Sequence, residues 1–223
     1  MNKTIIFDVN ETLLELSPLK KSINSAFEHE NAADIWFAEL LQYSLVESIT
    51  HSYHDFSEIA AAVLKMNAQK WNKDFSDKEI EKILSPITKL SAYPDVKTGL
   101  NKLKNAGYKL IAFSNGKPSV LKKQLDYAGL SEYFDKILSV DSVKKYKPHP
   151  DAYKYAVNIA GVDLKDVMMV AAHGWDITGA MRAGLETVFI QRPGKSLFPL
   201  AQKPTFETAN IETLSKILLG SKS

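Results

Sequence analysis

The most constraining feature of this sequence is the short apolar run Thr4–Phe7, which ends abruptly at Asp8. A continuous run of apolar and β-branched residues is typical of a strand buried in a parallel sheet. In open α/β sheets, chemistry takes place just beyond the carboxyl ends of the strands. Asp8 is therefore expected where its carboxylate can act as a nucleophile, with Thr12 in the following turn to orient it. The alternative is that Asp8 only caps the turn after an ordinary first strand.

Composition and charge exclude several classes of function. The chain has 223 residues, 45% of them hydrophobic and 24% charged, and a net charge of +2, which gives no reason to propose nucleic acid or a membrane surface as partner. It has no cysteine, which excludes disulfides, thiolate catalysis and cysteine-ligated metals. The first apolar run is too short for a signal peptide, and no run approaches the ~20 residues of a membrane span. We expect a cytoplasmic protein.

The hydrophobic pattern divides the chain into two parts. Residues 14–92 carry apolar side chains at helical spacing and show no convincing strand, whereas strands and helices alternate from Tyr93 onward. We expect strands near residues 109–113, 137–140, 167–170 and, as the last strand, 187–190. Such alternation predicts an α/β fold, a Rossmann-like doubly wound parallel sheet. The sheet domain would comprise residues 1–13 and 93–223, with an all-helical cap domain, 14–92, inserted after the first strand. Residues 220–223 would be a frayed tail.

Polar residues follow several of the expected strands. They are Asp8, Ser114, Asn115 and Asp176, together with Lys147 in a loop. Each alone has an ordinary explanation, such as a turn or a helix start. In this order they resemble the haloacid dehalogenase (HAD) superfamily of hydrolases over nearly the whole chain, and the helical insertion matches the cap of that family. The resemblance implies a nucleophile at Asp8, a substrate-binding hydroxyl at Ser114, a supporting cation at Lys147 and a second carboxylate at Asp176.

Two departures argue against the phosphatase branch of that superfamily. Phosphatases have a second aspartate two residues after the nucleophile, which protonates the leaving alcohol, and here that residue is Asn10. Their usual magnesium-ligating aspartate falls on Ala172, which offers no oxygen to a hard cation. We therefore expect no cofactor and no metal site; magnesium would be needed only if the chain were a phosphatase.

The same departures resemble the metal-independent type II (S)-2-haloacid dehalogenases, since a halide leaves as an anion without a proton. Tyr153 follows Lys147 by six residues and matches a tyrosine that neighbours the lysine in those enzymes. The segment Ala171–Asp176 is similar to their Ser-x-Asn-Ala-Trp/Phe-Asp motif. That similarity places Trp175 in the substrate site and gives Asp176 the role of activating water.

Three further positions differ from the dehalogenase pattern. Trp36 is followed by Phe37 instead of the arginine that receives the halide, and the cap contains no arginine, which leaves His51, His54 or a cap lysine as substitutes. His173 stands in place of the motif asparagine, and it could either share in water activation or only hydrogen-bond its neighbours. Glu11 replaces the usual glycine before Thr12. We expect the turn to differ there rather than to hold Glu11 at positive φ.

The interpretation is a HAD-like hydrolase of the 2-haloacid dehalogenase type, acting through a covalent ester and without metal. The alternatives are a hydrolase of the same fold for another C–X bond or an activated ester, a magnesium-dependent small-molecule phosphatase, and a catalytically idle binding protein. The substrate would be a small anion, most simply a short carboxylic acid, and the resemblance allows a homodimer. The expected catalytic residues are Asp8, Thr12, Lys147 and Asp176; the expected substrate-binding residues are Val9, Asn10, Phe37, Ser114, Asn115, Tyr153, His173 and Trp175.

Overall fold

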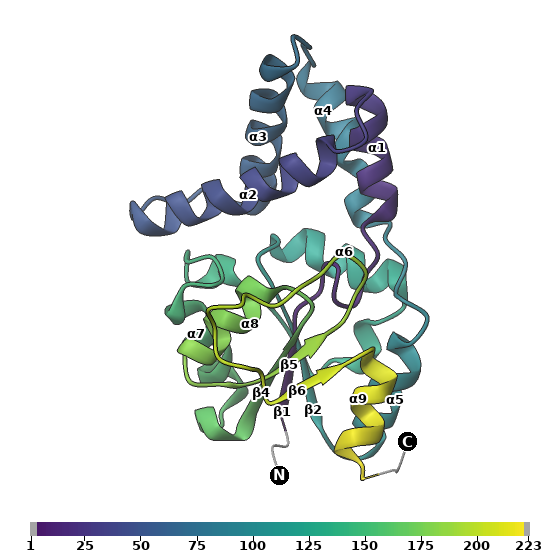
Figure 1. The fold of residues 1–223 in the computed structure, drawn as a ribbon, viewed down its shortest axis with the longest axis vertical. Coiled ribbons are helices and arrows are strands. Elements are labelled where there is room, and N and C mark those ends of the chain that lie inside the picture. The colour runs from purple at the N-terminus through teal and green to yellow at the C-terminus, as the bar shows by residue number, and fades with distance from the viewer. Residues whose placement is uncertain (1–3, 221–223) are drawn as a thin grey trace.

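The computed structural model describes residues 4–220, and these form an α/β fold around one parallel sheet (Figure 1). The six strands lie in the order β3-β2-β1-β4-β5-β6, and every neighbouring pair is parallel. This confirms the predicted α/β class and parallel sheet. The strands are β1 (Thr4–Phe7), β2 (Lys109–Ser114), β3 (Lys136–Ser139), β4 (Val167–Ala171), β5 (Glu186–Ile190) and β6 (Phe206–Thr208).

Strand β1 lies in the middle of the sheet and is completely buried. Phe7 is paired with Ala112 of β2 on one side and with Val170 of β4 on the other. The order of the strands reverses at β1, and in doubly wound sheets ligands bind at such a reversal, beyond the carboxyl ends of the strands. Asp8 leaves the sheet at this point.

Five α-helices lie between β1 and β2, and the first four, α1–α4, form a separate layer above the sheet in Figure 1. Both α3 and α4 begin with a reciprocal capping box, Asp55 with Glu58 and Ser76 with Glu79. The helical character predicted for this stretch is confirmed, while the domain boundaries after residues 13 and 92 stay a prediction. The α-helices of the described part are α1 (Ser17–Phe27), α2 (Ala32–Ile49), α3 (Phe56–Lys70), α4 (Asp77–Leu84), α5 (Val96–Asn105), α6 (Pro118–Ala128), α7 (Pro150–Ala160), α8 (Gly174–Arg182) and α9 (Ile211–Leu218).

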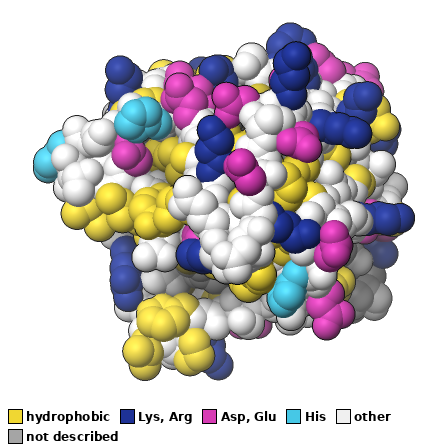
Figure 2. All heavy atoms as spheres, turned by 90° about the horizontal axis from the view of Figure 1, so that it is seen from above, with side chains coloured by type: hydrophobic (Ala, Val, Ile, Leu, Met, Phe, Trp, Pro, Cys, Tyr) yellow, Lys and Arg dark blue, Asp and Glu magenta, His cyan; other side chains and the backbone are white. Residues whose placement is uncertain are grey.

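Helix α2 is apolar around most of its circumference. Trp36 and Leu40 are buried, whereas Tyr43, Val46 and Ile49 are exposed. Figure 2, which views the molecule from the side of α1–α4, shows hydrophobic side chains among interspersed basic and acidic ones, without a face of one charge. None of the helices within residues 4–220 has the length and apolar character needed to cross a membrane.

The structure continues beyond the strand that the sequence predicts to be the last. Strand β6 pairs with β5, and α9 packs on α5. The prediction was wrong here because β6 is only three residues long and α9 only eight, so neither shows a clear periodic pattern. Ile211 and Leu214 of α9 are nonetheless fully buried. Apart from Gly220, the tail expected to fray lies outside the described residues.

We predict that Gly99→Ala lowers the free energy of unfolding by about 1–3 kcal/mol. Gly99 lies in α5, and a Cβ there would be 2.7 Å from backbone atoms of Ile211 in α9. In an open helix interior the same change would stabilise by about 1 kcal/mol, because alanine has the higher helix propensity. Urea denaturation measures the difference, with the exposed Asn101→Ala on the same helix as control. A Gly99→Ala protein at least as stable as the wild type would contradict the close packing of α5 and α9.

Candidate active site

Asp8 is held at the end of β1 by the turn that follows. Its side chain is buried, and Thr12 Oγ1 donates a hydrogen bond of 2.7 Å to Asp8 Oδ2. Thr12 Oγ1 also accepts the backbone N–H of Ala172, which follows β4. The neighbouring strands therefore fix the hydroxyl that orients Asp8, as the sequence predicts.

Lys147 joins the two buried carboxylates of the site. Its Nζ donates to Asp8 Oδ1 at 2.9 Å and to Asp176 Oδ2 at 2.6 Å. Burial opposes the ionisation of Asp8, but the charges of Lys147 and His173 outweigh it and hold the pKa of Asp8 well below its usual range. For Asp176, burial and the negative charge of Asp8 raise the pKa against the attraction of Lys147. Burial lowers the pKa of Lys147, but the two carboxylates raise it overall. Asp8 is therefore an anion, which is the state that a nucleophilic carboxylate requires.

The loop that carries Lys147 is fixed from two sides. Asn115, which the sequence predicts to bind substrate, accepts the backbone N–H of Lys147 and donates to its carbonyl. Tyr153 donates from its hydroxyl to Asp176 Oδ1 at 2.6 Å. Gly179 of α8 makes this packing possible, because a Cβ there would lie 2.3 Å from Pro148 and 2.7 Å from the Tyr153 hydroxyl. The contacts of the Asn115 side chain therefore fix the backbone of Lys147.

The other residues predicted to bind the substrate anion lie at the carboxyl ends of the neighbouring strands β1 and β2. Ser114 ends β2, and its Oγ accepts the backbone N–H of Gly116. Asn10 accepts a hydrogen bond from Gln124 Nε2 at 2.9 Å. Val9 is buried, and its carbonyl accepts the backbone N–H groups of Leu13 and Leu14.

Glu11 corrects the expectation for the turn. Its φ is 58°, so the turn keeps the left-handed conformation that a glycine would adopt easily. A non-glycine residue in this region costs about 1–3 kcal/mol unless its surroundings hold it there. Here the carboxylate is buried and contacts Lys195 Nζ at 2.6 Å, His173 Nε2 at 3.0 Å and Lys20 Nζ at 3.1 Å. These ion pairs offset the backbone strain, and the turn can therefore keep a positive φ although Glu11 stands where a glycine is expected.

His173 faces Asp8 and Glu11 and not Asp176. Its Nδ1 lies 3.4 Å from Asp8 Oδ2, and its Nε2 makes the contact with Glu11. Burial lowers the pKa of His173, but the two carboxylates raise it overall, so the imidazole is protonated more readily than usual. Two aromatic rings pack against it: Trp175 at 5.3 Å and Phe37 of α2 at 6.0 Å between ring centroids.

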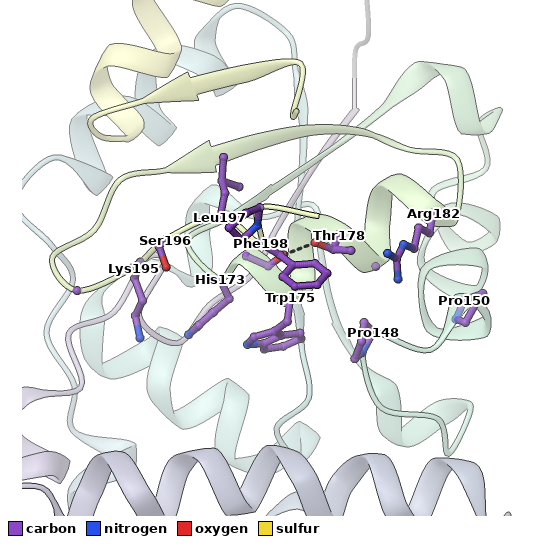
Figure 3. Close-up of a pocket in the computed structure, with 14 residues that line it drawn as sticks. Pro148, Pro150, His173, Trp175, Thr178, Arg182, Lys195, Ser196, Leu197 and Phe198 are labelled. Carbon is purple, nitrogen blue, oxygen red and sulfur yellow. Dashed lines mark hydrogen bonds between the residues drawn. The ribbon is translucent and has the colours of Figure 1, made fainter. Parts of the chain in front are cut away.

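Two hollows adjoin His173 and the aromatic rings packed against it. A cavity of about 70 Å³ lies between α2 and the sheet and is lined mainly by apolar side chains, among them Phe37 and Leu40, with Asn10 and Gly116 at the sheet side. A wider groove of about 860 Å³ runs along the start of α8 and reaches His173 and Trp175 (Figure 3). In Figure 3 the side chains of Lys195, His173 and Trp175 point toward the same side, where α2 crosses the lower edge of the picture.

The structure places both arginines away from Phe37. Arg192 makes two hydrogen bonds with Asp95 and two with the carbonyl of Thr12, so it fixes the turn after Asp8. His51 and His54 are exposed and contact Lys145 and Glu47. A cation approaches Phe37 from Lys195, whose Nζ lies 5.9 Å from the ring centroid. The sequence suggested cap residues as the source of this cation and did not point to Lys195, which follows β5.

The donors around Asp8 do not suit magnesium. Lys147 Nζ already bridges Asp8 and Asp176, and Ala172 brings no oxygen. Across residues 4–220, no group of three or more carboxylates and imidazoles has a geometry that could hold a metal ion.

Comparison with known proteins agrees with this geometry. A family model described as haloacid dehalogenase-like hydrolase matches residues 2–184. The (S)-2-haloacid dehalogenase 4A of Burkholderia cepacia is 31% identical over 86% of this chain and 84% of its own. An (S)-2-haloacid dehalogenase of Pseudomonas sp. (strain YL) is 27% identical over 96% and 94%. The chain belongs to the haloacid dehalogenase-like hydrolases.

A solved structure supports the fold. The L-2-haloacid dehalogenase of Xanthobacter autotrophicus, with chloropropionic acid covalently bound, superposes with a TM-score of 0.92, covering 100% of both chains at 23% identity. The predicted superfamily and its Rossmann-like sheet are confirmed. The roles assigned to individual site residues stay predictions. Glu11 and His173 were interpreted separately in the sequence, although both differ from the dehalogenase pattern. This joint difference was the signal that could have indicated their contact.

We predict that the stability difference between the wild type and Glu11→Gln narrows as the pH falls from about 4.5 toward 2. Burial raises the pKa of Glu11, but His173 and Lys195 outweigh it and lower that pKa from 4.5 to about 2. A carboxyl with a pKa depressed by folding contributes stability above its unfolded pKa and loses it as the pH falls through the folded one. At about 1.4 kcal/mol per pKa unit, the contribution at neutral pH is at most about 3 kcal/mol.

Urea denaturation of both proteins between about pH 3 and pH 7 measures this difference. The exposed Glu30→Gln is the matched control and should show no such trend. A difference that stays constant with pH would contradict the ion pairs of Glu11.

Proposed function

We propose that this hydrolase cleaves the carbon–halogen bond of short 2-haloacids, with Asp8 as the nucleophile. The observation that carries the proposal is the bridge of Lys147 between Asp8 and Asp176, with Asn10 and Ala172 at the positions where phosphatases need acids. The named relatives that match most of the chain are (S)-2-haloacid dehalogenases, which supports the same reaction.

The reaction has two steps. An oxygen of Asp8 attacks C2 of the substrate and forms an ester, while the C–X electron pair leaves with the halide. Water then attacks the carbonyl carbon of that ester, and the oxygen that came from Asp8 leaves with the 2-hydroxyacid. Because a halide needs no proton on leaving, Asn10 in place of an acid costs the first step nothing.

No metal is required in this proposal. The positive charge that steadies Asp8 comes from Lys147, whose ammonium is buried between the two carboxylates. The substrate carboxylate would bind at Ser114 and at the backbone N–H groups beside Val9 and Asn10. The helical layer, joined to the sheet by two linkers near residues 13 and 92, would act as a cap domain that closes over the substrate.

The leaving group needs a cation near Phe37, where related dehalogenases have an arginine. Lys195 supplies one, although its ammonium is also paired with Glu11. This pairing favours a second candidate function, hydrolysis of another C–X bond or of an activated ester on the same scaffold, for which a strong halide site is unnecessary.

We predict that the protein releases halide from (S)-2-chloropropionate or fluoroacetate, and that EDTA or added magnesium leaves the rate unchanged. Asp8→Asn should lower this rate at least about 1000-fold, because the amide cannot form the ester. Ion chromatography measures the halide, and the exposed Asp151→Asn on α7 is the control that should keep full activity.

The contrary outcomes point to specific alternatives. Full activity of Asp8→Asn would remove Asp8 from the reaction. Magnesium-dependent hydrolysis of p-nitrophenyl phosphate without halide release would favour a phosphatase. Hydrolysis of p-nitrophenyl acetate without halide release would favour the second candidate function.

A further inference from the structure

We propose that His173 takes the proton from the water that hydrolyses the Asp8 ester, and that Glu11 positions its imidazole for this step. The inference rests on the proposed function, because it concerns the second half of that reaction. It moves to His173 a role that the resemblance to dehalogenases gives to Asp176.

The geometry is that of a nucleophile, a base and a group that orients the base. His173 Nε2 lies 3.0 Å from Glu11 Oε2, and His173 Nδ1 lies 3.4 Å from Asp8 Oδ2. With its Nε2–H donated to Glu11, a neutral imidazole presents the lone pair of Nδ1 to Asp8. Covalent hydrolases are recognised by this mutual placement, whatever the fold that carries it.

In the neutral imidazole, the Nδ1 atom is free to take a proton. It is buried, and within residues 4–220 it has no hydrogen-bond partner of good geometry. A buried polar atom without a partner is costly, so its presence beside the nucleophile calls for a function. The stacked ring of Trp175 and the tilted ring of Phe37 pack against the imidazole and restrict its orientation.

Asp176 is poorly placed for the same task. Its two oxygens accept short hydrogen bonds, one from Lys147 and one from Tyr153, each of 2.6 Å. Its exposed fraction is 0%, whereas that of His173 is 6%, and His173 lines the open groove along α8. Water can reach His173 along this groove, and Asp176 serves to position Lys147.

The charges around His173 change in the right direction during the reaction. The charged groups that face it are Asp8, Glu11 and, through Glu11, Lys195. In the free enzyme the two carboxylates raise its pKa and favour the imidazolium. Formation of the ester removes the negative charge of Asp8. Burial and Lys195 then favour the neutral imidazole, which forms when the Nδ1 proton passes to solvent, so that a base is available when water must be activated.

The proposed step balances in atoms and protons. Water attacks Cγ of Asp8 and gives one proton to His173 Nδ1. The bond between Cγ and the ester oxygen breaks, and His173 returns the proton to the departing 2-hydroxyacid. The second proton of the water remains on the new Asp8 carboxyl and passes to solvent when the carboxyl ionises.

The test compares wild type, His173→Gln and Glu11→Gly in rapid-quench reactions with (S)-2-chloropropionate. For His173→Gln we expect a burst of about one halide per chain, followed by turnover slowed at least about 100-fold, as for loss of a general base. Mass spectrometry should show the added mass on the quenched intact protein and, after digestion, the substrate ester on the peptide that contains Asp8. Glutamine is close in size to histidine and keeps a hydrogen-bonding side chain, but it cannot take up a proton.

Glu11→Gly tests the positioning role without disturbing the turn, because glycine adopts the φ of 58° without strain. We expect ester hydrolysis to slow at least about 10-fold while the halide burst stays near the wild-type rate. The apparent pKa of ester hydrolysis should also fall, since the imidazolium loses an anionic partner; a merely structural role would leave this pKa in place.

Two outcomes would overturn the inference while the proposed function stands: His173→Gln could slow the burst and the later turnover equally with no ester detected, or Asp176→Asn could accumulate ester where His173→Gln does not. A wild-type enzyme that releases no halide would instead overturn the proposed function, and this inference with it. Circular dichroism of each variant confirms its fold.

Discussion

The ammonium of Lys147, buried between Asp8 and Asp176, is the interaction on which the site depends. Taking one cation and two carboxylates out of water is unfavourable, and only close pairing offsets the cost. Removing one member of a buried pair typically costs about 3–5 kcal/mol, because the partner charge is left uncompensated. The sheet order, the contacts of Asn115 with the Lys147 backbone and the absence of a Cβ at Gly179 all serve to bring these three groups together.

A second charged group, formed by Glu11, Lys195 and Lys20, adjoins the Lys147 bridge through His173. Glu11 sits at a backbone position suited to glycine, and ion pairs with Lys195 and Lys20 hold it there. The two groups share Asp8, so a change of charge on Asp8 is felt by Lys147 on one side and by His173 on the other. In the proposed reaction, this coupling would let Asp8 serve first as the nucleophile and then, as an ester, free the imidazole of His173 to act as a base.

Much of the fold could be predicted from local patterns. The buried run before Asp8, the helical stretch after it and the later alternation specify a parallel sheet with a helical insertion. The residues of the Lys147 bridge could be predicted too, because Asp8 directly follows β1 and the order of the motifs pointed to Lys147 in its loop and to Asp176 at the start of α8. Strand β6 and α9 were missed, since short elements are specified by contacts with β5 and α5 and not by periodicity.

The charged group around Glu11 could not be predicted in the same way. Lys195 lies 184 residues from Glu11 and carries no motif, and only the folded chain brings its ammonium to that carboxylate. The conformation of the turn was predicted wrongly because backbone preference alone disfavours Glu11 at positive φ, and the ion pairs that compensate come from distant segments.

The most direct test of the central claim is a single turnover in water enriched in ¹⁸O, with enzyme in excess over (S)-2-chloropropionate. If Asp8 attacks the substrate, the lactate formed carries an unlabelled oxygen from Asp8, and the ¹⁸O is found in the Asp8 side chain by peptide mass spectrometry. Labelled lactate in the first turnover, with unlabelled Asp8, would mean that water attacks C2 directly and would contradict the account.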